Sequence, residues 1–177
     1  IFYGPSGTGK TTVAEIAAAR IGRPFYRLNA TTSGIADIKD MVAEVGTLAA
    51  PNGILLYLDE IQYFNKKQQQ SLLEYLESGD ITMIASTTEN PHFYVYNAII
   101  SRSSLFEFKA VPPAECLKML RRALDHLNER GGTTTALSDR VGLILAESVG
   151  GDVRRAVGLL ENAYFAAGFE PGAEITL

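Results

Sequence analysis

The sequence predicts an α/β fold, in which helices flank a parallel sheet and a small all-helical domain follows. Over the first 110 residues, short apolar runs alternate with longer segments of helical periodicity, as is typical of parallel strands joined by crossover helices. After Pro112-Pro113 this alternation stops, and three amphipathic helical segments follow. We therefore expect a core at residues 1–110 and a helical lid domain at residues 111–177.

The composition is that of an ordinary globular chain. Hydrophobic residues make up 46% and charged residues 20% of the 177 positions, and no apolar run approaches the roughly 20 residues that span a membrane. The net charge of -4 gives no overall attraction to nucleic acid, so any DNA contact needs a local basic patch. Cys116 is the one cysteine, and we expect it to be a packed, reduced thiol in a cytoplasmic protein.

The first predicted elements each have a local justification. Residues 1–3 are a short apolar stretch that predicts the end of a strand, and the alanine-rich run 13–20 predicts a helix. Pro24 introduces a strand predicted at residues 25–29. The helix that follows carries its apolar side chains on one face, namely Ile35, Ile38, Met41, Val42 and Val45.

The centre of the predicted sheet follows a Pro51-Asn52-Gly53 turn. Residues 54–58 form a continuous apolar run, as expected of a strand that is buried on both faces. The remaining core elements are a polar helix at about 67–77, a strand at 81–86, a short helix at 98–102 and a strand at 105–108.

Three helices are predicted for the lid domain. Leucines at positions 117, 120, 124 and 127 mark the first, which Gly131-Gly132 ends. Ser138 has the character of an N-cap for the second, which Gly150-Gly151 ends. Asp152 is expected to cap the third, whose inward residues are Val153, Ala156, Val157 and Leu160.

A complete phosphate-binding loop lies between the first strand and the first helix. It matches the pattern G-x-x-x-x-G-K-S/T, and its residues are Gly4, Pro5, Ser6, Gly7, Thr8, Gly9, Lys10 and Thr11, with Thr12 beside them. Glycines let backbone N–H groups wrap a phosphate, and the helix N-terminus adds partial positive charge. Lys10 would reach the β- and γ-phosphates, and the Thr11 hydroxyl would hold Mg²⁺. The sequence thus predicts a P-loop NTPase with ATP and Mg²⁺ as cofactors.

Two adjacent carboxylates follow the apolar strand at 54–58. Asp59 and Glu60 stand at the carboxyl end of this strand, where open α/β sheets bind their ligands. We expect Asp59 to hold the Mg²⁺ shell and Glu60 to activate the attacking water as general base. The 49 positions from Lys10 to Asp59 (59 minus 10) fit this combination.

Three further positions are candidates whose roles the residues alone leave open. Thr88 could orient the lytic water or be an ordinary turn residue. Arg102 could be a surface charge or a finger that reaches a neighbouring subunit's nucleotide. Arg154 lies in the first turn of a predicted helix, where a cation is mildly unfavourable unless a phosphate is its partner.

The order of these motifs resembles the AAA+ ATPases of the clamp-loader branch. Within that branch, residues 58–69 (LDEIQYFNKKQQ) and 87–91 (TTENP) are similar to signatures of the replication-associated recombination protein A family and its Werner-helicase-interacting relatives. The resemblance implies that Thr88 is the sensor-1 residue, Arg102 a finger acting in trans, and Arg154 the sensor-2 arginine. From the complete phosphate loop and the otherwise unfavourable place of Arg154 on its helix, we expect ATP to bind between core and lid.

The resemblance carries further expectations about the whole protein. It implies a nucleoid-associated, DNA-stimulated ATPase that acts at forks, gaps or single-stranded ends. It implies a homo-oligomer, such as a tetramer or another ring, with single-stranded DNA-binding protein as a partner. Lys66 and Lys67 begin the helix that faces the central channel in clamp-loader relatives, where they could meet DNA or remain solvated.

Two departures from the family pattern are visible. Gln62-Tyr63 replaces the usual His-Arg pair, which removes a basic residue near the presumed DNA side. The chain begins three residues before Gly4, without the family's adenine-binding linker, and it lacks the oligomerisation domain after the lid. We therefore expect a piece of a longer protein that is monomeric and nearly inactive by itself.

Alternative functions share much of this pattern. A clamp-loader subunit or a branch-migration motor has the same motifs except for the TTENP segment. A non-catalytic nucleotide-binding module is a second alternative. The joint presence of Lys10, Thr11, Asp59, Glu60 and Thr88 disfavours that module, since inactive subunits tend to lose one or more of them.

Overall fold

The computed structural model describes residues 1–168 and 172–176. It divides into two units. An α/β unit comprises Ile1–Gly4 and Gly9–Phe108, and a helical unit comprises Pro5–Thr8 together with the chain from Lys109 onward. Residues 5–8 of the phosphate loop therefore group with the helical unit, whereas Gly4 and Gly9–Thr11 group with the sheet.

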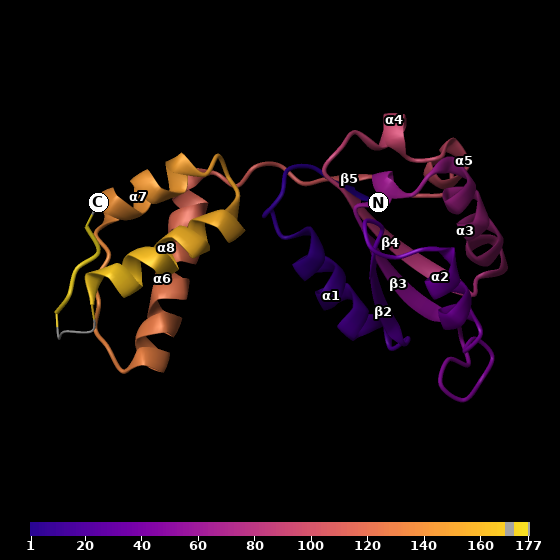
Figure 1. The fold of residues 1–177 in the computed structure, drawn as a ribbon, viewed down its shortest axis with the longest axis horizontal. Helices are drawn as coiled ribbons and strands as arrows, with labels where there is room; N and C mark the ends of the chain where they lie inside the picture. The colour runs from indigo at the N-terminus through magenta and orange to yellow at the C-terminus, as the bar shows by residue number, and fades with distance from the viewer. Residues whose placement is uncertain (169–171, 177) are drawn as a thin grey trace. The chain divides into compact units, whose positions relative to one another are not determined.

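The α/β unit is built on a five-stranded sheet with the order β2-β3-β4-β1-β5, and all of its strand pairs are parallel (Figure 1). This arrangement confirms the predicted fold class. Its strands are β1 (Phe2–Tyr3), β2 (Phe25–Asn29), β3 (Ile54–Asp59), β4 (Ile81–Thr87) and β5 (Phe106–Glu107). Its helices are α1 (Lys10–Ile21), α2 (Ile35–Val42), α3 (Lys66–Ser78), α4 (Pro91–Tyr94) and α5 (Asn97–Ile100), with a 3-10 turn η1 (Ile61–Tyr63).

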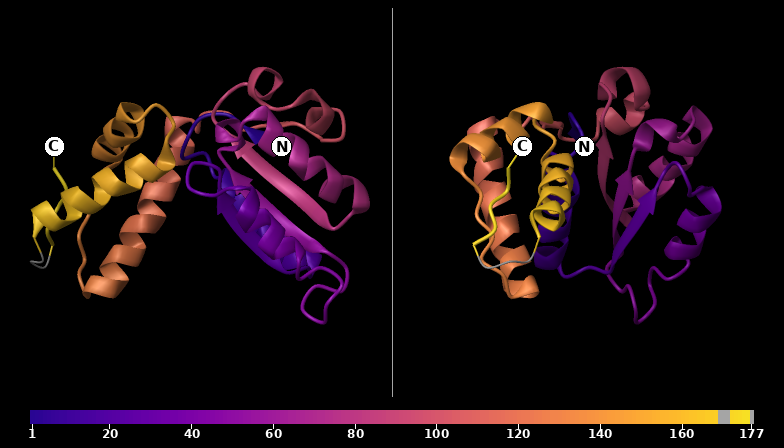
Figure 2. Two further views of the ribbon diagram at one scale, coloured as in Figure 1. Left: turned by 45° about the vertical axis from the view of Figure 1, so that its right-hand side comes forward. Right: turned by 60° about the vertical axis from the view of Figure 1, so that its left-hand side comes forward.

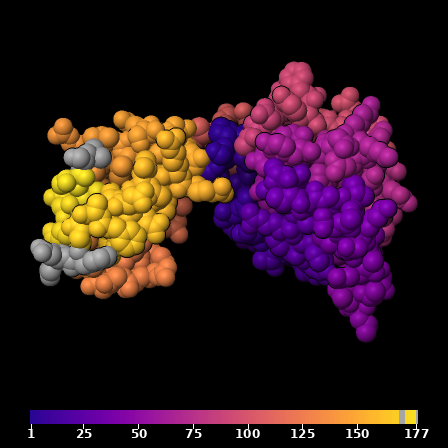
Figure 3. Space-filling model, viewed as in Figure 1, coloured from indigo at the N-terminus to yellow at the C-terminus, as the bar shows by residue number. Residues whose placement is uncertain are grey.

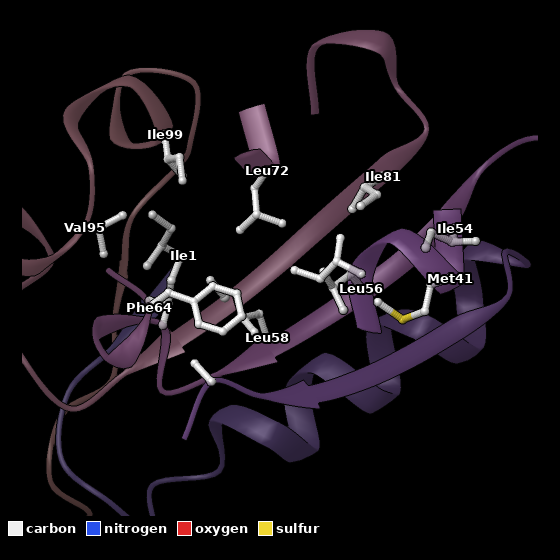
Figure 4. Close-up of a cluster of buried hydrophobic side chains, with 14 of the residues drawn as sticks. Ile1, Met41, Ile54, Leu56, Leu58, Phe64, Leu72, Ile81, Val95 and Ile99 are labelled. Carbon is white, nitrogen blue, oxygen red and sulfur yellow. The ribbon is translucent and has the colours of Figure 1, made fainter. Parts of the chain in front are cut away.

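Strand β3 is buried on both faces, as its unbroken apolar sequence predicts. Because side chains alternate along a strand, Ile54, Leu56 and Leu58 point into one cluster, where they meet residues of α2 and α3 such as Ile38 and Leu72. Figure 4 shows these strand residues within the cluster, which also contains Phe64. The opposite face of the sheet is covered by α1, as the views in Figure 2 show.

Most predicted elements are confirmed, with small differences that have physical reasons. Helix α2 ends at Val42 rather than Val45, because the chain turns there and Val45 forms an isolated bridge with Ala50. The short helix α4 was not predicted, although its signal is present in the sequence. Asn90 accepts a hydrogen bond from the His92 backbone N–H at 3.0 Å, and Pro91 occupies the first helical position.

The loop between α2 and β3, residues 43–53, projects from the surface of the α/β unit (Figure 3). The side chain of Leu48 within it is fully exposed. Gly53 ends this loop with φ +82°, and an added Cβ would lie 2.7 Å from the Asp80 carbonyl oxygen. Only glycine lets the backbone come this close to the Asp80 carbonyl oxygen without a shift of its neighbours. The chain enters β3 directly after it.

The helical unit consists of α6 (Pro113–Gly131), α7 (Asp139–Ser148) and α8 (Val153–Ala167). Its core includes Leu120, Leu160 and the fully buried Cys116, and burial raises the pKa of the Cys116 thiol. Ser138 occupies the predicted N-cap position, but its side chain makes no capping hydrogen bond. Across the described residues, no helix combines the length and apolarity that crossing a membrane would need.

Candidate active site

The phosphate loop begins with a glycine that no other residue could replace. Gly4 has φ +133°, and an added Cβ would lie 2.0 Å from the carbonyl oxygen of Phe108. Its N–H donates to the Thr87 carbonyl oxygen at 3.2 Å, which anchors the start of the loop to β4. Gly9, with φ +94°, is the N-cap of α1 and supplies no side-chain cap. The first N–H groups of α1 thus have no side-chain cap, as an anion site at a helix N-terminus requires.

Lys10 is buried, and its ammonium group donates to the Gly4 carbonyl oxygen at 2.8 Å. Its side chain therefore curls back over the loop to which it belongs. The first turn of α1 contains no acidic residue, so its positive end keeps its attraction for phosphate.

The two predicted metal ligands are joined by a buried polar cluster. The Thr11 hydroxyl lies 3.0 Å from the Tyr57 hydroxyl, which lies 3.3 Å from Oδ1 of Asp59 and 2.9 Å from Oγ of Ser86. Ser86 in turn donates to the same Oδ1 of Asp59. Burial is the main cause that raises the pKa of Tyr57, so its hydroxyl keeps its proton at neutral pH.

The donor set suits Mg²⁺. Thr11 and Asp59 offer oxygen atoms that both contact one hydroxyl, and Mg²⁺ is held by one or two protein oxygens together with phosphates and waters. Within the described part of the chain, no group of three or more His, Cys, Asp or Glu residues forms a protein-only metal site. His92 and His126 are both exposed.

Glu60 has a strained backbone. Its φ of 56° makes it the one non-glycine residue with positive φ among those described, a conformation that costs on the order of 1–3 kcal/mol and is frequent at functional sites. Gln62 donates to Oε2 of Glu60 at 2.5 Å, and the Thr88 hydroxyl lies 3.5 Å from the same oxygen. The structure thus brings Thr88 and Glu60 together.

Arg102 follows α5 and is engaged within its own unit. Its guanidinium forms an ion pair with Glu77 of α3 at 2.8 Å, and both side chains are about half exposed. It also donates to the Ala98 carbonyl oxygen at 3.0 Å. An exposed pair of this kind is worth only about 0–1 kcal/mol.

Within the helical unit, the tip of the phosphate loop is tied to the start of α8. The Ser6 hydroxyl donates to Oδ2 of Asp152 at 2.6 Å, and Val153 N–H donates to the Gly7 carbonyl oxygen at 3.2 Å. Asp152 also caps α8 by accepting from Arg155 N–H at 3.0 Å, as predicted. Arg154 is exposed in the first turn of this helix.

A phosphate loop between the first strand and helix of a parallel sheet, with an acidic pair at the end of β3, defines a P-loop nucleotide-binding protein. The chain belongs to the AAA family, the ATPase family associated with various cellular activities, whose profile matches residues 1–111.

Relatives place the chain more closely within this family. It is 41% identical over 164 residues to the replication-associated recombination protein A of Haemophilus influenzae, covering 91% of this chain and 36% of that protein. It is 37% identical over 163 residues to the protein of the same name from Escherichia coli, again covering 91% and 36%. The chain thus spans about a third of the length of these curated relatives.

Solved structures confirm the fold. The chain superposes on the Holliday junction branch migration motor RuvB of Thermotoga maritima with a TM-score of 0.79 and 19% identity, over 99% of this chain and 57% of that one. NtrX of Brucella abortus matches with a TM-score of 0.77 and 21% identity, over 99% and 49%. At these identities the likeness shows the fold alone.

The sequence did not single out Tyr57, Ser86 and Gln62, whose side chains contact the predicted site residues Thr11, Asp59 and Glu60. Tyr57 could have been found from its spacing, because a residue two positions before Asp59 in a strand shares its face. Ser86 needed the alignment of β3 with β4, in which Leu58 is opposite Ala85. Nothing in the sequence indicates the positive φ of Glu60.

The strain at Glu60 can be measured by comparing Glu60→Gly with Glu60→Ala. Both changes remove the carboxylate, but only glycine adopts a positive φ without steric cost. We expect the glycine variant to be more stable by about 1 kcal/mol in urea unfolding, the reverse of the usual order. Equal stabilities, or a more stable alanine variant, would show that the site is unstrained.

Asp152 makes the stability of the helical unit depend on pH. The hydrogen bond from Ser6 is the main cause that lowers the pKa of Asp152. Because the folded pKa is depressed, its contribution is complete above about pH 4, the ordinary aspartate value. The contribution is lost as the pH falls through the lower folded value.

Asp152→Ala should therefore lower the free energy of unfolding by about 0.5–2 kcal/mol at pH 7. Asp152→Asn retains a capping oxygen and should lose less. Urea unfolding at pH 7 and below pH 4 measures both effects. The prediction is wrong if the difference between wild type and the asparagine variant does not shrink at the lower pH.

Proposed function

We propose that this chain is the ATP-hydrolysing part of a DNA-stimulated ATPase that acts in replication-fork maintenance, recombination and repair. The observation that carries the proposal is the joint arrangement of Lys10, Thr11, Asp59, Glu60 and Thr88 within one α/β unit. Membership of the AAA family and the similarity to replication-associated recombination proteins support it. The intact set of polar residues disfavours a non-catalytic module.

Each proposed role follows from chemistry at the carboxyl edge of the sheet. Lys10 exchanges the Gly4 carbonyl oxygen for the β- and γ-phosphates. Glu60 takes a proton from the attacking water, and Thr88, which lies beside the same carboxylate oxygen, orients that water. Thr11 and Asp59 would hold Mg²⁺, which neutralises phosphate charge when it is bound.

Two arginines are proposed to act on the γ-phosphate. Arg154 serves as the sensor-2 residue, since a phosphate partner would justify a cation in the first turn of α8. Arg102 serves as a finger toward the nucleotide of a neighbouring subunit. Its ion pair with Glu77 is weak, so it is easily exchanged for a phosphate.

The DNA contact is proposed at the start of α3. Lys66 and Lys67 are exposed there, and the Lys66 ammonium lies 5.3 Å from the centre of the Tyr96 ring. Each lysine that meets a DNA phosphate adds about one unit to the salt dependence of binding. For the whole protein, we also propose a homo-oligomeric ring that has single-stranded DNA-binding protein as a partner.

Three substitutions in the full-length protein test the site. Lys10→Ala should abolish tight ATP binding, measured by calorimetry. Glu60→Gln should bind ATP normally but hydrolyse it about 10²-fold more slowly or worse, because it lacks the general base. Asp59→Asn should instead weaken binding and Mg²⁺ dependence together. Unchanged affinity in Lys10→Ala, or equal mild effects of the two acidic substitutions, would refute these roles.

A mixing experiment tests Arg102. Subunits with Arg102→Ala keep a complete pocket but lack the finger, whereas Lys10→Ala subunits keep the finger but lack a working pocket. Mixing the two should restore ATPase activity if the finger acts in trans. Glu77→Gln is the matched control, because it frees Arg102 and should not lower activity. Absence of restoration despite demonstrated co-assembly would reject the finger.

A further inference from the structure

The hydroxyl groups of Tyr57 and Ser86 stand between the two proposed metal ligands. We propose that they are positioning residues that form a directed hydrogen-bond relay from Thr11 to Asp59 and so present the Thr11 oxygen to the metal. This inference rests on the proposed function, since it concerns the same Mg²⁺ site. It adds two residues that act through Thr11 and Asp59 and are not themselves proposed to bind the nucleotide or the metal.

The pleat of the sheet explains how these residues meet. Tyr57 and Asp59 lie two positions apart on β3, so both point to the face that α1 covers, and Thr11 is in the first turn of that helix. The parallel alignment of Leu58 with Ala85 places Ser86 of β4 next to Asp59. The residues Tyr57 and Ser86 are fully buried, so water does not substitute for their partners.

The direction of the relay follows from counting protons. A carboxylate only accepts, so Ser86 commits its one proton to Asp59. The Ser86 oxygen then accepts from Tyr57 at 2.9 Å, which is closer than the 3.3 Å from Tyr57 to Asp59. With its own proton committed, the Tyr57 oxygen accepts from Thr11 at 3.0 Å.

The opposite direction would leave a buried group unsatisfied. If Tyr57 donated to Thr11, the buried Ser86 oxygen would lose the hydrogen bond that it accepts from Tyr57. The loss of a hydrogen bond costs more free energy at a buried group than at an exposed one. In the favoured direction the Thr11 proton points toward Tyr57, and its lone pairs are free for a cation. Groups that orient metal ligands in this way commonly change metal affinity by about 10–100-fold.

The test measures metal dependence rather than turnover. In the full-length protein, binding of a fluorescent ADP analogue is titrated with Mg²⁺, starting from an EDTA baseline. We expect Tyr57→Phe to raise the Mg²⁺ concentration for half-maximal effect by about 10–100-fold. Binding in EDTA should stay within about twofold of wild type. Tyr26→Phe is the matched control, because its hydroxyl bonds exposed Glu44 and should leave the titration unchanged.

Ser86→Ala provides a second variant and a test of the relay as a unit. It should shift the Mg²⁺ titration in the same direction but by less, because Tyr57 can still donate to Asp59 at 3.3 Å. The double variant should be no worse than Tyr57→Phe alone, because the link from Thr11 is already lost in that single variant. An unchanged titration in a folded Tyr57→Phe protein, or fully additive shifts, would overturn the relay.

Failure of the proposed function gives a different result. Wild-type protein would then bind no nucleotide with or without Mg²⁺. The relay is judged in that case by NMR of the metal-free protein, in which the Thr11 hydroxyl proton should be protected and close to the Tyr57 ring. Loss of that protected proton in Tyr57→Phe supports the relay, and its absence from wild type rejects it.

Discussion

The burial of β3 on both faces is the constraint on which the α/β unit depends. A strand with no solvent-facing side must place every second residue in each of two packed layers. Ile54, Leu56 and Leu58 accordingly serve the cluster with α2 and α3. The alternate residues of the strand face α1. Tyr57 and Asp59 are among them and therefore lie beside Thr11, at the end of the phosphate loop. The alternation of side chains along β3 thus both packs the core and places the polar residues of the candidate site.

The polar groups on the α1 face of β3 are compatible with burial because they satisfy one another. A hydroxyl that is removed from water without a partner costs about 1–3 kcal/mol. Here Tyr57 and Ser86 are linked to each other and to Thr11 and Asp59. The cluster therefore keeps its geometry without bulk solvent, as preorganised sites generally require.

Much of the fold was predictable from the sequence because its signals are local. A few adjacent residues are enough to predict each of these elements: the apolar run 54–58, the turn at 51–53 and the loop from Gly4 to Thr11. The contact of Ser86 with Asp59 is different in kind, since it depends on how two strands align that bring together residues 27 positions apart in the sequence. The positive φ of Glu60 is likewise imposed by the junction of β3 with η1, and no residue type at that position signals it.

The solitary cysteine has a practical consequence for studying this chain. Cys116 is fully buried in the helical unit, and the sequence contains no other thiol. A thiol-reactive dye can modify it only when α6 separates from its neighbours. The rate of labelling therefore reports how often the helical unit opens. The α/β unit carries no cysteine and is invisible to the dye. Chemical labelling can therefore follow the stability of one unit without interference from the other.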